Sequence, residues 1–198
     1  MKRVLMSMVF VLAAGWWMSP PATAQQKLVI KPLAEKKVAE LPAGPLFWLI
    51  ENFDSRAQAH AAAGPWGLVV ESDGRIWLFT LGSQGRSSVG GTRVAEVGPI
   101  SPPVASRYLL RINEASGPPG STTSVHSHPG SEAFYVLAGQ QSIRTPDGVM
   151  RVEVGQPEAG HSAATPMQVT STGTTDLRSL VMFIVDAGKP FSSPSKIP

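Results

Sequence analysis

The sequence contains no cysteine among its 198 residues. It therefore forms no disulfide bond, holds no metal through thiolates and carries no lipidated cysteine. It also lacks any cluster of Lys and Arg interleaved with aromatic residues, so a nucleic-acid partner is not indicated. Stability must come from an ordinary packed core, for which 42% of hydrophobic residues is enough.

Long helical patterns are scarce as well, whereas glycine and proline are frequent. The 19 glycines and 18 prolines separate short β-prone segments, which is typical of an all-β fold rich in turns. One short helix is expected over residues 55–63, with Asp54 as its N-cap. We predict strands over residues 27–31, 36–41, 46–53, 66–71, 75–81, 92–97, 107–113, 134–137, 140–144 and 149–154.

The one long hydrophobic run lies at the N-terminus. Lys2 and Arg3 precede an almost continuously apolar stretch over residues 4–18, and residues 22–24 match an A-x-A cleavage site. This pattern predicts a signal peptide over residues 1–24 and a periplasmic or secreted protein that begins at Gln25. An uncleaved anchor is the alternative, but the run is short of the ~20 residues that span a bilayer.

Cleavage would change the charge balance. Without Lys2 and Arg3, 15 Lys and Arg remain against 14 Asp and Glu, a net charge of about +1. The sequence therefore offers little argument for an anionic macromolecular partner, and no stable membrane span is expected in the mature chain.

A potential metal site occurs over residues 120–139. His126 and His128 are two residues apart, which places both imidazoles on one face of a strand about 6.6 Å apart along it. Glu132 follows after a turn at Pro129 and Gly130. Two imidazoles and a carboxylate suit a divalent transition metal such as Fe, Mn, Ni, Zn or Cu.

The same residues resemble the first motif of the cupin superfamily. The motif runs Gly, five residues, His-x-His, three residues, Glu, six residues, Gly, and it is complete here at Gly120, His126, His128, Glu132 and Gly139. The resemblance extends over about residues 105–186. It implies an antiparallel β-barrel of the jelly-roll type, with a metal bound inside it.

The second cupin motif is degenerate. The resemblance implies a fourth ligand, a histidine, in this motif. Counting back from Ser171-Thr172-Gly173 places the histidine position on Met167, whereas counting forward from Gly155 places it one residue earlier. We therefore interpret Met167 as the replacement, and a thioether binds hard divalent ions poorly.

His161 is the nearby candidate to compensate. It lies six residues before Met167, about 20 Å along a straight strand. It could reach the metal only if residues 155–166 form a loop, so ligand and bystander roles both stay open.

These observations predict a signal peptide over residues 1–24, an N-terminal extension over 25–104 that packs on the barrel, and a cupin-like barrel over 105–198. The expected function is metal binding, with oxygenase-like chemistry on a small organic molecule. The alternative is a non-catalytic binding or structural module with a degenerate metal site. By residue type Glu153, Arg111 and Tyr135 are candidates for proton transfer, and the sequence leaves a homodimer open.

Overall fold

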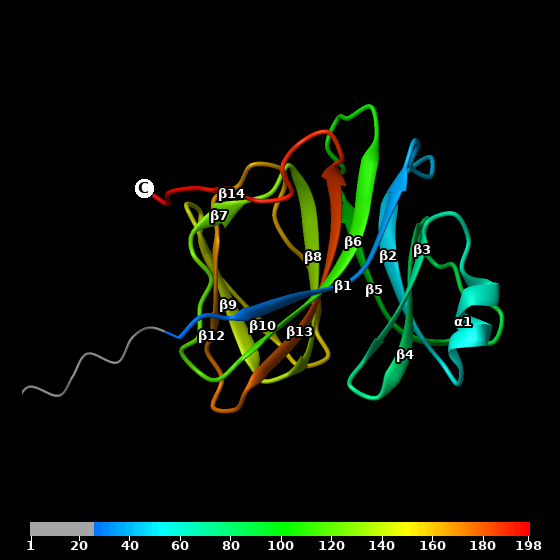
Figure 1. Ribbon diagram of the computed structural model, residues 1–198, viewed down its shortest axis with the longest axis horizontal. Coiled ribbons are helices and arrows are strands. Elements are labelled where there is room, and N and C mark those ends of the chain that lie inside the picture. The colour runs from blue at the N-terminus through cyan, green and yellow to red at the C-terminus, as the bar shows by residue number, and fades with distance from the viewer. Residues whose placement is uncertain (1–25) are drawn as a thin grey trace, which may run out of the picture.

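The computed structural model describes residues 26–198, so the predicted signal peptide lies outside the described residues. This part of the chain contains one helix and fourteen strands (Figure 1). The elements are β1 (Val29–Val38), β2 (Leu46–Phe53), α1 (Arg56–Ala62), β3 (Gly67–Ser72), β4 (Arg75–Gly82), β5 (Thr92–Ile100), β6 (Tyr108–Gly117), β7 (His126–Ser127), β8 (Gly130–Ala138), β9 (Gln140–Thr145), β10 (Gly148–Glu153), β11 (Pro157–Ala159), β12 (Gln168–Ser171), β13 (Leu177–Asp186) and β14 (Ser193–Pro194).

Antiparallel strands form a jelly-roll barrel, which confirms the predicted cupin-like all-β fold. A five-stranded sheet in the order β1-β6-β13-β8-β11 faces a three-stranded sheet in the order β10-β9-β12, and the short pair β14-β7 lies at one end (Figure 1). A hydrophobic core fills much of the space between them and includes Phe134, Ile143, Val169 and Val181.

A second layer packs on the outer face of the five-stranded sheet. It is the four-stranded sheet β3-β4-β2-β5, and the core between the two sheets includes Trp48, Trp77 and Phe79. Trp77 and Phe79 alternate along β4, so they share the face of that strand that packs in this core. Helix α1 packs on the far side of this sheet through Ala59.

Strand β13 is buried on both faces, because it lies between these two cores. Val181, Phe183 and Val185 face the barrel interior, and the residues between them face the second layer. Alternate residues of a strand point to opposite faces, so the sequence of a strand that is buried on both faces is an almost continuous run of apolar residues.

Two local expectations were wrong. Residues 27–31 and 36–41 were expected as separate strands, but β1 runs without a break from Val29 to Val38, because its whole length pairs with β6 across one irregularity. Ser55 rather than Asp54 caps α1, since its side chain accepts a hydrogen bond from the backbone N–H of Gln58. No helix among residues 26–198 has the length and apolar character needed to cross a membrane.

Candidate metal and ligand site in the barrel

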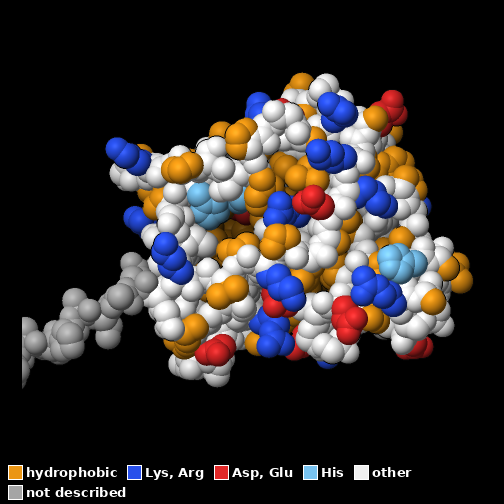
Figure 2. All heavy atoms as spheres, in the orientation of Figure 1, with side chains coloured by type: hydrophobic (Ala, Val, Ile, Leu, Met, Phe, Trp, Pro, Cys, Tyr) orange, Lys and Arg blue, Asp and Glu red, His pale blue; other side chains and the backbone are white. Residues whose placement is uncertain are grey.

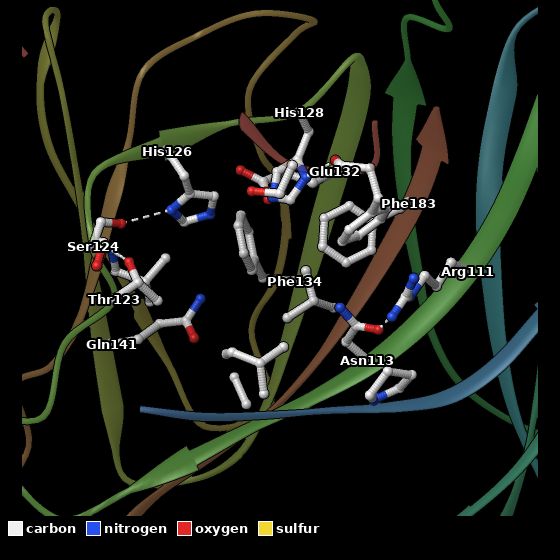
Figure 3. A pocket seen from close by; sticks show the side chains of 17 residues that line it. Arg111, Asn113, Thr123, Ser124, His126, His128, Glu132, Phe134, Gln141 and Phe183 are labelled. Atoms are coloured by element: carbon white, nitrogen blue, oxygen red, sulfur yellow. Dashed lines mark hydrogen bonds between the residues drawn. The ribbon is translucent and has the colours of Figure 1, made fainter. Parts of the chain in front are cut away.

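The structure brings His126 and His128 together at one end of the barrel. Their ring centroids are 4.9 Å apart, and the rings meet edge to face. His126 is fixed by two backbone hydrogen bonds with Met167, and His128 is held through its carbonyl oxygen, which accepts from the N–H of Ala164. Both side chains line the same cavity (Figure 3).

Hydrogen bonds to the backbone define the tautomer of both imidazoles. Nδ1 of His126 lies 2.8 Å from the carbonyl oxygen of Ser124, and Nδ1 of His128 lies 2.7 Å from that of Phe191. A carbonyl oxygen can only accept, so Nδ1–H must donate in both cases. In the neutral rings Nε2 then carries the lone pair, which is the arrangement that metal-binding histidines use.

His128 is neutral at physiological pH. Its side chain is buried, and burial lowers its pKa to about 4. The hydrogen bond to Phe191 opposes this shift, whereas the positive charge of Arg111 adds to it. Nε2 of His128 is therefore available as an electron-pair donor at pH 7.

Glu132 is a buried carboxyl group next to the same cavity. It is only 4% exposed, and burial raises its pKa to about 8. Its backbone is fixed by β-pairing with Phe183 and by hydrogen bonds to the loop at Gly160 and His161. Within the described part of the chain its Oε1 has no hydrogen-bond partner. Such an atom costs free energy unless a cation, a proton or another donor reaches it.

The cavity has a volume of about 400 Å³ and opens on one face of the molecule. Figure 2 shows a hollow on this face, with histidine and hydrophobic side chains around it. Its walls are mostly apolar, with a small number of polar groups, which is the usual character of a small-molecule site. The apolar lining residues are Ile30, Pro32, Ala115, Phe134, Val169, Val181, Phe183 and Phe191.

The structure separates His161 from this cavity. His161 lines a different pocket of about 110 Å³, which lies on another side of Glu132 and includes Ser101 and Ser131. Nε2 of His161 is buried and finds no partner among residues 26–198. The loop over residues 155–166 thus carries His161 close to Glu132 along the backbone without placing its ring beside the two imidazoles.

Met167 lies directly opposite His126. The two residues exchange both backbone hydrogen bonds, at 3.0 and 2.8 Å. Directly opposite residues of an antiparallel pair have side chains on the same face. The Met167 side chain is buried in the barrel core, so an apolar thioether occupies the position beside the first histidine.

Of the three residues considered for proton transfer, Arg111 lines the cavity. Tyr135 packs against Trp77 in the core between the two sheets, and Glu153 accepts a hydrogen bond from Gln140 at the surface. Sequence reasoning missed the lining residues Asn113, Gln141 and Phe191. The signal for Asn113 was available, because it shares the strand face of Arg111.

The donor types fit a divalent transition metal, but the three side chains are not gathered around one point. Two imidazole Nε2 atoms and a buried carboxylate are suitable ligands. Nevertheless, between residues 26 and 198 no three His, Cys, Asp or Glu side chains are arranged so that they could hold one ion together. The two histidines therefore form the defined part of the site, and Glu132 contributes the carboxyl group that lines the same cavity.

No protein-family model matches the sequence, and no curated protein matches it. Several solved structures are similar to part of the chain. One chain from the crystal structures of the DMSP lyases RdDddP and RnDddQII is 24% identical, with a TM-score of 0.38, over 44% of each chain. This chain thus covers less than half of that lyase.

Two further similar structures are cupins by their descriptions. A cupin-like protein from Thermotoga maritima is 13% identical with a TM-score of 0.39, over 44% of this chain and 65% of that one. A cupin superfamily protein from Desulfitobacterium hafniense is 17% identical with a TM-score of 0.35, over 39% and 68%. Because these TM-scores are all below 0.5, no conclusion about this chain is drawn from the similarity, and the jelly-roll fold follows from the order of its own sheets.

Proposed function

We propose that this protein binds a divalent transition metal at the mouth of its barrel through His126, His128 and Glu132, and a small organic molecule beside the metal. The observation that carries the proposal is the pair of imidazoles. Both donate Nδ1–H to backbone carbonyls, which leaves both Nε2 lone pairs available in a cavity that Glu132 also lines, and Oε1 of Glu132 has no hydrogen-bond partner within residues 26–198.

The chain supplies the surroundings that metal chemistry needs. A bound metal would act there as a Lewis acid or as a redox centre with open coordination positions. Phe134, Phe183 and Val181 give the cavity an apolar lining, and the ring of Phe191 packs against the ring of His128. We propose metal-dependent chemistry on a small organic molecule, with oxygenase-like chemistry as the first reaction class to test.

A non-catalytic binding protein is the second candidate. Two observations favour it: the apolar Met167 lies opposite His126, at the position that we interpret as the missing histidine, and the three ligand side chains are not gathered around one point. Metal content separates the two candidates. Stoichiometric iron or manganese in protein purified from its native compartment favours the enzyme, whereas protein without metal favours the binding module.

Substitutions at His128 and Met167 test the proposed set of metal ligands. His128→Ala should weaken metal affinity at least ~100-fold, because it removes one of three strong donors. Met167→Ala should leave affinity nearly unchanged, whereas Met167→His should increase it by adding a nitrogen donor on the face of His126. Metal titration with elemental analysis measures each change.

His161→Ala is the matched control, since His161 lines the other pocket. It should bind metal like the parent protein. A large loss in this variant would make His161 a ligand after all. If Met167→His folds normally and binds no more tightly than the parent, the alignment of the second motif is wrong.

We also propose that the protein is exported and acts in the periplasm or outside the cell. The support is the three-part pattern of residues 1–24, in which a basic start, an apolar run and an A-x-A site follow one another. Mature protein should begin at Gln25. N-terminal sequencing of the native protein checks this, and membrane-bound material that still begins at Met1 would contradict it.

A further inference from the structure

We propose that the wall of the cavity formed by Arg111 and Asn113 binds the carboxylate of a small, otherwise apolar organic acid. The inference rests on the proposed function in one respect, that the cavity is a ligand site, and it names the class of ligand. It follows from the orientation of the buried Asn113 amide, the position of the Arg111 guanidinium at the cavity wall and the mostly apolar character of the rest of the lining.

The orientation of the Asn113 amide is determined by Arg111. Nε of Arg111 donates a hydrogen bond of 2.9 Å to Oδ1 of Asn113. Because a guanidinium can only donate, the carbonyl side of the amide must face Arg111 and the NH₂ group must face away from it. Figure 3 shows that the Nδ2 atom then points toward the cavity.

Asn113 therefore presents two N–H donors to the cavity. The residue is 2% exposed, and it lines the cavity wall. Oδ1 accepts the hydrogen bond from Arg111, whereas Nδ2 donates no hydrogen bond to any atom within residues 26–198. An N–H group in such a confined wall gains free energy when a ligand in the cavity offers it an acceptor.

Arg111 supplies a fixed positive charge at the same wall. Its guanidinium carbon lies 4.2 Å from the ring centroid of Phe191, which packs against it. An oxygen of Glu35 lies 3.5 Å from Nη1, but the Glu35 side chain is 57% exposed whereas that of Arg111 is 17% exposed. The Glu35 carboxylate is therefore the more hydrated partner of this ion pair, whereas the guanidinium lies at the cavity wall, where a ligand can reach its other N–H groups.

The donors and the charge together select an anionic acceptor. Within the cavity wall the two donors of Asn113 and the remaining N–H groups of Arg111 suit an oxygen anion, and charge-assisted hydrogen bonds are about twice as strong as neutral ones. The planar guanidinium fork suits a carboxylate in particular. Phe134, Phe183, Val169 and Val181 offer only apolar contact, so the rest of the ligand should be a hydrocarbon or an aromatic ring.

Benzoate and nitrobenzene form the test pair, because they share a planar shape and differ in charge. Binding is measured by calorimetry or ligand-observed NMR on protein treated with a chelator, so that no metal competes for the carboxylate. The native protein should bind benzoate at least ~10-fold more tightly than nitrobenzene. Asn113→Asp should weaken the affinity for benzoate at least ~30-fold, because it replaces the N–H donors by an acceptor with a negative charge.

The variants are chosen so that the fold survives. In Asn113→Asp the new carboxylate can still accept the hydrogen bond from Arg111. Asn113→Leu removes the N–H donors without adding charge, and it should weaken the affinity for benzoate ~10-fold. Both should change nitrobenzene affinity by less than ~3-fold. Gln156→Glu adds the same charge at an exposed turn and should leave both ligands unchanged.

Equal affinity for the two ligands, no binding of either by the native protein, or equal losses in Asn113→Asp would overturn the proposal. Metal content is measured separately on untreated protein. If benzoate is selected but no metal is found, the metal site fails while the carboxylate site stands. If metal is bound but benzoate is not preferred over nitrobenzene, the carboxylate site fails while the metal site stands.

Discussion

Glu132→Gln should abolish stoichiometric metal binding and, in the metal-free protein, increase stability above pH 7. The neutral amide cannot replace the anionic ligand, so metal affinity should fall at least ~100-fold. The stability gain has a different origin. Burial raises the pKa of Glu132 to about 8, so the metal-free fold keeps this carboxyl protonated at neutral pH.

The sign of the pH dependence follows from linkage. The folded-state pKa of Glu132 lies above its ordinary value of 4.5, so the folded state binds a proton that the unfolded state has released. The corresponding stability is complete below pH 4.5 and is lost as the pH rises toward 8, at about 1.4 kcal/mol per pH unit at most. The amide of the Glu132→Gln variant does not titrate, so this loss should vanish, and the stability advantage of the variant over the parent should grow as the pH rises toward 8.

His128 contributes the opposite slope over a lower range. Its folded-state pKa of about 4 lies below its ordinary value of 6.5, so its contribution is present above pH 6.5 and is lost as the pH falls toward 4. Between about pH 4.5 and 6.5 the two slopes oppose each other, and the stability of the metal-free protein should change little there. Above pH 6.5 the Glu132 contribution dominates.

Urea denaturation of chelator-treated protein from pH 4 to 9 measures these slopes, and metal titration at pH 7.5 measures the affinity. Glu40→Gln, which changes an exposed carboxylate on a loop, is the matched control, and it should alter neither the pH dependence of stability nor the metal affinity. A Glu132→Gln variant that still binds metal stoichiometrically would remove Glu132 from the ligand set. A decline in stability above pH 7 equal to that of the parent would show that Glu132 is not the group that titrates.

The spacing of residues along the chain predicted the parts of this site that depend on one strand segment. His126 and His128 share a face because the backbone alternates. The motif alignment interpreted Met167 as the replacement of the fourth ligand, and in the structure Met167 lies opposite His126. The alternation of β6 also puts Asn113 on the face of Arg111, but this signal was not used, so Asn113 was missed. These features follow from local geometry, so the sequence was sufficient for them.

Other parts of the site depend on contacts between distant segments. Phe191 accepts the hydrogen bond from His128 and packs against Arg111, although it comes from the C-terminal segment 63 residues later. No pattern around Phe191 predicts this role. The loop before Met167 turns His161 into a separate pocket, and its glycines permit several paths. Contacts between distant segments determine the positions of both Phe191 and His161, so the periodicity of the sequence could not predict them.

Gly130→Ala should be among the most destabilising substitutions in the described chain, at a cost of at least about 4 kcal/mol. Gly130 begins β8 between His128 and Glu132 and pairs with Val185 of β13. A Cβ at this position would overlap the carbonyl oxygen of Ile184 and would lie 2.5 Å from the Cα of Val185. Both are backbone atoms of a central strand, so neither can move aside as a flexible side chain could.

Relief of this overlap would require β8 to separate from β13, which moves Glu132 and the turn that carries His128. The variant should therefore lose metal affinity together with stability. Gly64→Ala is the control, because a Cβ there meets no atom within 4 Å and the backbone needs no positive φ. Urea denaturation of the two variants should show a large loss for Gly130→Ala and a change within about 0.5 kcal/mol for Gly64→Ala. Native-like stability of Gly130→Ala would mean that the two strands are not in such close contact, and the positions assigned to Glu132 and His128 would have to be revised with them.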